Sequence, residues 1–129
     1  MILTMKEFLK NDRFAALAGV ELLEVEHGYA KARMLLTPDH MNAVGVCQGG
    51  ALFTLADLAF AAVANNGVPP TFSVSSNMVF IRSVRSGYVY AEAREVVSHH
   101  RLPFIEVSVT DEAGEVLAVY TATGYRKSL

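Results

Sequence analysis

The sequence of 129 residues is poor in cysteine, in net charge and in long apolar runs. Its single cysteine, Cys47, excludes an intrachain disulfide and is typical of a reducing compartment. The net charge of −2 gives no basic surface of the kind that nucleic acid requires. No apolar run reaches the roughly 18 residues of a membrane span, and the first residues lack the pattern of a secretory signal. We therefore expect a cytoplasmic protein that binds neither nucleic acid nor membrane.

The length fits a single domain over residues 1–129. A chain of this size buries about two-thirds of the surface that it exposes when unfolded. Hydrophobic residues make up 52% of the sequence, which is more apolar surface than so small a monomer is expected to bury. We therefore expect the chain to self-associate.

Formal charge is almost absent from the middle of the chain. Between His40 and Ile81 the only charged residue is Asp57, and between residues 51 and 64 the only other polar side chain is Thr54. A segment that is apolar on every side is typical of a helix buried all round. A lone carboxylate there is costly unless it is hydrogen-bonded or neutralised, and perturbed carboxylates cluster at functional sites. Asp57 is therefore the first candidate catalytic residue, although a purely structural role remains possible.

Periodicity predicts one N-terminal helix, two strands, the long apolar helix and four further strands. The N-terminal helix is expected over residues 4–17 with a capping box formed by Thr4 and Glu7. The long helix is expected to begin at Gly49 and to end at Asn65-Asn66-Gly67, residues suited to a left-handed cap. The strands are expected at 20–26, 29–37, 71–82, 87–98, 102–111 and 115–126. This order predicts an α+β fold in which an antiparallel sheet curls around one central helix, and its open edges favour pairing with a second copy.

The loop from Asn42 to Gly50 leads into the N-terminus of the long helix. Free amide N–H groups and the helix dipole favour negative charge there, and two glycines let a ligand approach the backbone. Together with a carboxylate, this arrangement indicates an oxyanion hole and a base or nucleophile, the groups that acyl transfer requires. Gly49 and Asp57 are eight residues apart, which is about 12 Å along one helix. They cannot act on one carbonyl from the same helix, so a working site would combine two subunits of a dimer.

The residues of this segment resemble the signature of hotdog-fold acyl-CoA thioesterases of the phenylacetic-acid-degradation (PaaI-like) type, and the likeness extends over essentially the whole chain. The residues that carry it are Asn42-x-x-Gly45-x-x-Gln48-Gly49-Gly50-x-x-Phe53-x-Leu55-Ala56-Asp57-x-Ala59-Phe60. The resemblance implies a hotdog fold and hydrolysis of an acyl-CoA thioester. It also implies that CoA is part of the substrate, that no further cofactor is needed, and that a tetramer built from dimers is plausible.

The resemblance assigns roles to five residues. Asp57 matches the catalytic carboxylate, as nucleophile or as base for water, and Gly49 matches the backbone donor to the thioester carbonyl. Asn42 matches a polar side chain that positions water or thioester, and Ser73 falls near a hydroxyl that assists the carboxylate. Gln48 stands where the family usually has histidine; glutamine keeps a hydrogen-bonding amide but does not titrate near neutral pH. This substitution keeps open the alternative of a non-hydrolytic acyl-CoA-binding or regulatory protein.

Further candidates concern substrate binding. Gly50 and Phe53 are expected to line the acyl site, and Arg82 and Arg101 to meet the phosphates of CoA, because guanidinium suits phosphate. The apolar residues around the motif fit an aryl or a medium-chain acyl group and do not separate the two. No metal site is expected, since the adjacent histidines at 99 and 100 have no cysteine or carboxylate to complete a set. A hotdog-fold dehydratase is disfavoured, because neither His27 nor His40 lies in a comparable motif.

Overall fold

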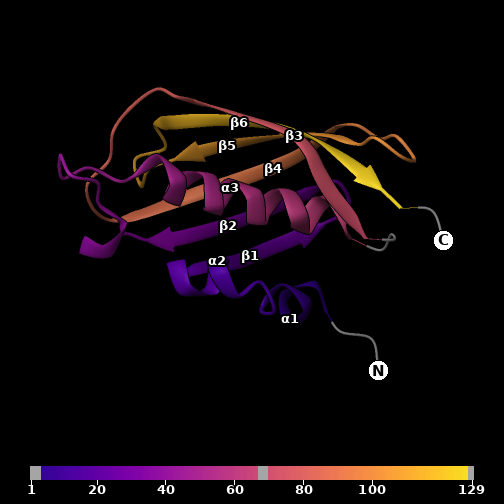
Figure 1. The fold of residues 1–129 in the computed structure, drawn as a ribbon, viewed down its shortest axis with the longest axis horizontal. Coiled ribbons are helices and arrows are strands. Elements are labelled where there is room, and N and C mark those ends of the chain that lie inside the picture. The colour runs from indigo at the N-terminus through magenta and orange to yellow at the C-terminus, as the bar shows by residue number, and fades with distance from the viewer. Residues whose placement is uncertain (1–3, 67–69, 128–129) are drawn as a thin grey trace.

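The computed structural model describes residues 4–66 and 70–127. Six antiparallel strands form one sheet in the order β1-β2-β4-β5-β6-β3 (Figure 1). The strands are β1 (Val20–Glu26), β2 (Tyr29–Leu35), β3 (Thr71–Phe80), β4 (Tyr88–Val97), β5 (Phe104–Thr110) and β6 (Val116–Arg126). This architecture confirms the expected antiparallel sheet, and it leaves β1 and β3 as the two edges.

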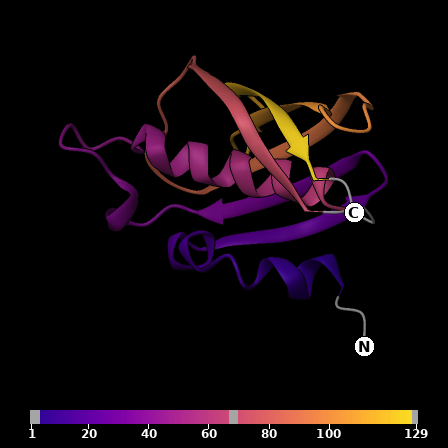
Figure 2. The same cartoon turned by 45° about the vertical axis from the view of Figure 1, so that its right-hand side comes forward.

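One long helix, α3 (Gly49–Ala64), packs against the sheet, with most of its contacts on β2, β4 and β5. The sheet curves around this helix (Figure 2). Four of the positions of β2 and β4 that face the core are alanines, which lets the helix lie close to the strands: Ala30, Ala32, Ala91 and Ala93 are completely buried. The buried side of α3 is apolar throughout, as its lack of charge predicts: Leu52, Leu55, Ala56, Leu58, Ala59, Phe60, Ala62, Val63 and Ala64.

The N-terminal segment forms two short helices, so the expectation of one helix over residues 4–17 is wrong. They are α1 (Met5–Leu9) and α2 (Arg13–Ala18). The capping box of Thr4 and Glu7 is confirmed. The interruption comes from Asp12, whose backbone leaves the helical region while its side chain accepts a hydrogen bond from the Ala15 N–H at 3.0 Å. Asp12 therefore acts as the N-cap of a new helix.

Neither Asn65 nor Asn66, at the C-terminal end of α3, has the left-handed conformation of the expected cap. Asn65 has φ −106° and ψ 1°, and no residue other than glycine has a positive φ among the described residues. The side chain of Asn65 closes the helix, because it donates to the Ala61 carbonyl and accepts from the Thr71 N–H at 2.7 Å. Gly67, the last residue of the expected cap, lies outside the described residues.

The start of α3 depends on Gln48. The side-chain oxygen Oε1 of Gln48 accepts a hydrogen bond from the Gly50 N–H at 2.8 Å, so Gln48 is the N-cap of the helix. A Cβ on Gly50 would lie 2.5 Å from this oxygen, and a Cβ on Gly49 would lie 2.9 Å from Cζ of Phe80. Each glycine therefore leaves room for one neighbouring side chain.

This geometry predicts coupling between Gln48 and Gly50. In a Gln48→Ala background, Gly50→Ala should stabilise the protein by up to about 1 kcal/mol, because alanine is the better helix residue. In the wild type the new Cβ displaces the Gln48 cap, whose loss costs about 1 kcal/mol, so the gain should disappear. Denaturant unfolding of the four variants at one protein concentration measures the difference. An equal effect of Gly50→Ala in both backgrounds would contradict the cap.

Candidate active site

Asp57 lies on the side of α3 that the sheet leaves uncovered. Its side chain is half-buried, and its Oδ1 accepts a hydrogen bond from the hydroxyl of Tyr120 on β6 at 2.8 Å. Burial raises the pKa of Asp57 above its ordinary value, and the nearby carboxylate of Asp12 adds to the rise, while the Tyr120 hydrogen bond opposes it. The structure thus contains the hydrogen-bonded carboxylate in an apolar helix that the sequence indicates.

Tyr120 is the residue of this site that the sequence does not reveal. Tyr120 lies on the buried side of β6 with Ala118 and Ala122, but the alternation of the strand does not show that it faces Asp57, which is 63 residues away. A polar hydroxyl on a core position is the signal that could have found it, since buried hydroxyls take a partner. Burial also raises the pKa of Tyr120 above its ordinary value, so the hydroxyl keeps its proton at neutral pH.

The serine associated with Asp57 is Ser76. Its Oγ lies 3.4 Å from the hydroxyl of Tyr120, so it is linked to the carboxylate through the tyrosine. Ser73 is exposed on β3, opposite Gly124 of β6. A role for Ser73 in the reaction stays a prediction.

The polar groups expected around Gly49 lie in the loop before α3 and at the start of the helix. The side-chain oxygen of Asn42 accepts hydrogen bonds from the N–H groups of Val44, Gly45 and Val46 at 3.0–3.2 Å. The side chain of Asn42 thus stabilises the loop in which it lies. The Gly49 N–H has no hydrogen-bond acceptor within residues 4–66 and 70–127. It is therefore a free backbone donor at a helix N-terminus, the property that an oxyanion hole needs.

The Gly49 N–H and the Asp57 carboxylate do not meet within one chain. Gly49 and Asp57 lie on the same unbroken helix, α3, and eight residues of helix separate them by about 12 Å. The structure confirms the helical spacing on which the expectation of a two-subunit site rests.

A cleft of about 1060 Å³ opens beside the N-terminus of α3. The cleft is lined by Gln48, Gly50 and Thr54, by apolar residues of α2 and of the end of β2, and by the polar residues Thr37, Asp39 and His40. Gly50 thus takes part in the cleft, whereas Phe53 packs edge-on against the ring of Tyr120, with 5.1 Å between the ring centroids. The apolar members of the cleft are Phe14, Leu17, Ala18, Leu35, Met41 and Ala51.

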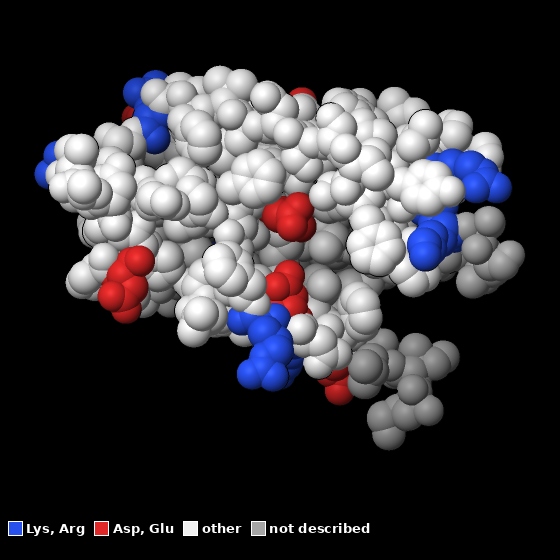
Figure 3. Space-filling view, in the orientation of Figure 1, with Lys and Arg blue, Asp and Glu red and all other residues white. Residues whose placement is uncertain are grey.

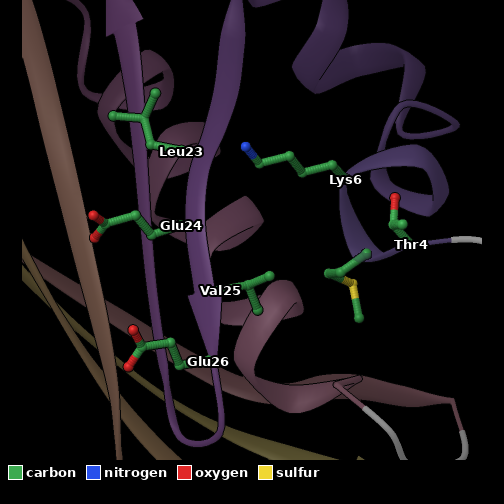
Figure 4. A pocket seen from close by; sticks show the side chains of 7 residues that line it. Thr4, Lys6, Leu23, Glu24, Val25 and Glu26 are labelled. Atoms are coloured by element: carbon green, nitrogen blue, oxygen red, sulfur yellow. The ribbon is translucent and has the colours of Figure 1, made fainter.

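A smaller groove of about 410 Å³ lies between α1 and β1 (Figure 4). Val25 points toward α1, whereas Glu24 and Glu26 point away from it (Figure 4). No acid and base converge there, so this groove does not compete with the Asp57 site.

The remaining candidates lie on the surface. Arg82 forms an exposed ion pair with Glu115 at 3.4 Å, and Arg101 is exposed in the turn before β5.

Other kinds of site find no support among the described residues. Burial raises the pKa of the Cys47 thiol to about 11, which makes it a poor nucleophile. Within the part of the chain that the structure describes, no group of histidine, cysteine and acidic residues could hold a metal ion, and no helix is long and apolar enough to cross a membrane.

Known proteins share both the sequence and the shape of this chain. A protein of Archaeoglobus fulgidus is 32% identical over 128 residues, which are 98% of this chain and 83% of the relative. The acyl-coenzyme A thioesterase PaaI of Escherichia coli is 23% identical over 91% of this chain and 84% of its own length. Its structure superposes with a TM-score of 0.90, covering 94% of this chain and 88% of that one. A mutant of the phenylacetic acid degradation protein PaaI of Thermus thermophilus is 32% identical, with a TM-score of 0.85 over 90% of this chain and all of its own (100%).

Residues 44–118 match the Thioesterase superfamily. This range begins in the loop before α3 and ends in β6, so it includes Gly49 and Asp57. The match, the shared hotdog fold and the relatives confirm the resemblance, and the chain belongs to the thioesterase superfamily.

Proposed function

We propose that the protein hydrolyses an acyl-CoA thioester and that Asp57 carries the reaction. The observation behind this proposal is a half-buried, hydrogen-bonded carboxylate on the uncovered side of a helix whose first N–H, at Gly49, is free. In the reaction the Gly49 N–H stabilises the oxyanion that develops on the thioester carbonyl. Asp57 attacks the carbonyl carbon or takes a proton from the attacking water. When water attacks, the C–S bond breaks, the thiolate of CoA leaves and takes up a proton, and the oxygen of water remains in the acid. When Asp57 attacks, the same C–S bond breaks and leaves an acyl-aspartyl anhydride, which water then hydrolyses to the free acid and the Asp57 carboxylate. The relation to the E. coli acyl-CoA thioesterase supports CoA as the thiol.

The proposed site is composite, with Gly49 from one subunit and Asp57 from its partner. The uncovered surface of the described chain fits such a dimer. The edge strand β3 and the residue after it carry five exposed large apolar side chains: Phe72, Val74, Val79, Phe80 and Ile81. The face of the molecule seen in Figure 1 is also largely uncharged (Figure 3). An exposed apolar edge strand favours pairing with another chain, and a second copy provides the missing half of the site. Pairs of dimers would give a tetramer.

The cleft beside α3 supports an apolar acyl group. Its volume of about 1060 Å³ and its apolar residues from α2 and β2 leave room for an aryl or a medium-chain acyl group. Arg101 and Arg82 are proposed to meet the phosphates of CoA, which requires Arg82 to leave its exposed ion pair with Glu115. Such a pair contributes little to stability, so phosphate can replace the carboxylate at small cost.

Gln48 supports a second candidate, an acyl-CoA-binding protein without turnover. Its Oε1 caps α3, and its amide does not titrate near neutral pH. It therefore cannot shuttle a proton as histidine does. If turnover required such a shuttle, the same cleft would bind acyl-CoA without hydrolysing it.

Replacement of Asp57 separates these functions. Asp57→Asn keeps the size of the side chain but removes the base, and we expect thiol release from acyl-CoA esters to fall by about 10²–10⁴-fold. The assay uses phenylacetyl, hydroxybenzoyl, short-chain, medium-chain and long-chain CoA esters, and the thiol signal that Cys47 itself gives with the reagent is subtracted. Glu106→Gln, an exposed carboxylate on β5, serves as control and should match the wild type. Turnover that persists in Asp57→Asn would refute the proposed role of Asp57, and binding without turnover in the wild type would favour the second candidate.

The dimer can be tested at β3. Val79 is 55% exposed on β3, and Val96, at the end of β4, is 57% exposed. We expect Val79→Lys to weaken the dimer at least about tenfold, because it buries an unpaired charge in each half of the interface. Thiol release should fall with it, although the subunit stays folded. Val96→Lys should change neither. Sedimentation velocity over a range of concentrations measures the monomer–dimer equilibrium. A wild type that is monomeric at micromolar concentration would contradict the composite site.

A further inference from the structure

Tyr120 is held in place by three side chains of α3. Its hydroxyl binds Asp57, and its ring makes edge-on contacts with Phe53 and Phe60, at centroid distances of 5.1 Å and 6.3 Å. Phe53 is four residues before Asp57 and Phe60 three residues after it, so all three lie on neighbouring turns of the helix. Tyr120 is completely buried. Its hydroxyl therefore has a fixed position relative to the carboxylate.

The hydrogen bonds in this cluster have one direction. A tyrosine hydroxyl has a single proton, and in this structure it goes to Oδ1 of Asp57. Ser76 lies 3.4 Å away on the other side and can only donate to the same hydroxyl. The hydrogen bonds thus run from Ser76 on β3 to Tyr120 on β6 and from Tyr120 to Asp57 on α3, so that two strands are linked to one carboxylate oxygen of the helix.

The other carboxylate oxygen of Asp57, Oδ2, is available to react. Oδ2 accepts no hydrogen bond from the described residues, and no buried side-chain oxygen or nitrogen among them lacks a partner. Oδ2 is therefore open to solvent rather than sealed in the core. We propose that Tyr120 is a positioning residue for Asp57, which holds Oδ1 so that Oδ2 is the oxygen that attacks the thioester or activates water. This inference rests on the proposed function of Asp57.

The proposal predicts an effect on rate and not on substrate binding. Tyr120 is buried and does not line the cleft, so KM should not change when its hydroxyl is removed. The turnover number should fall, because an unfixed carboxylate spends less time in the reactive geometry. A purely structural role would lower stability and leave the kinetics of the folded protein unchanged.

The pH profile gives a second, independent readout. The groups that act on the pKa of Asp57 are Tyr120 from β6, which lowers it, and Asp12 from α2, which raises it together with burial. Toward α3, β2, β4 and β5 present apolar side chains, and the β3 serine of the cluster does not titrate. The ionised carboxylate is the active form, so removal of the tyrosine hydroxyl raises the pKa of Asp57. The acid limb of the rate profile should then move to higher pH.

The test compares Tyr120→Phe with Tyr125→Phe. Tyr125 lies on the same strand but is 40% exposed and serves as the matched control. We expect Tyr120→Phe to lower kcat by about tenfold, the size of one hydrogen bond to a charged group, with KM within about twofold of the wild type. The acid limb should move up by up to about one pH unit, and Tyr125→Phe should change none of these. A kcat and an acid limb equal to those of the wild type would overturn the proposal.

A carboxyl titration by ¹³C NMR tests the contact without any substrate. The pKa of Asp57 should be higher in Tyr120→Phe than in the wild type and unchanged in Tyr125→Phe. An unchanged pKa in Tyr120→Phe overturns the inference even in an inactive preparation. The result for Asp57→Asn distinguishes a failure of the proposed function from a failure of the proposed role of Tyr120. If that variant is inactive while Tyr120→Phe behaves as the wild type, only the role of Tyr120 fails. If Asp57→Asn retains turnover, the proposed function fails, and the role of Tyr120 fails with it.

Discussion

Burial of α3 in the curved sheet is the constraint on which the rest of the structure depends. Nine of the sixteen residues of the helix are buried, and they can be buried only because the facing strands offer small side chains such as Ala32 and Ala91. Close packing of this kind leaves no space for a charged group. The charge-free sequence of the helix follows from this packing, and so does the position of its one exception. Asp57 can be accommodated only on the side that the sheet does not cover.

The uncovered side of α3 then has two properties that act together. It is apolar enough to raise the pKa of a carboxylate through burial, and it lies within reach of a core tyrosine that gives the carboxylate a hydrogen bond. Burial makes the carboxylate more basic, and the hydrogen bond limits that change and fixes one oxygen. A base is most useful when its pKa is moderately raised and its geometry is fixed. The fold supplies both conditions at Asp57.

The sequence predicts those features that depend on local pattern. The two-residue period of the strands, the apolar length of α3 and the Thr4 capping box are all properties of neighbouring residues, and the structure confirms them. The break at Asp12 was missed because the apolar spacing continues across it, and only the cap geometry shows that a second helix begins. The link from Tyr120 to Asp57 joins residues 63 positions apart. It depends on the register of β6 against the sheet and on the position of α3, neither of which follows from a period of two.

The separation of Gly49 from Asp57 connects catalysis with assembly. A rigid helix cannot bring its first N–H to a carboxylate eight residues further on, and the buried side of α3 prevents the helix from bending around a substrate. In the dimer that we propose, two such helices lie side by side, so that the Gly49 N–H of one faces the carboxylate of the other. The same contact would cover the exposed apolar side chains of β3. Apolar burial would then provide the free energy of association, while the Gly49 N–H at the start of α3 and the Asp57 carboxylate near its middle would provide the chemistry. Each active site would exist only while both subunits are joined, and each dimer would contain two of them.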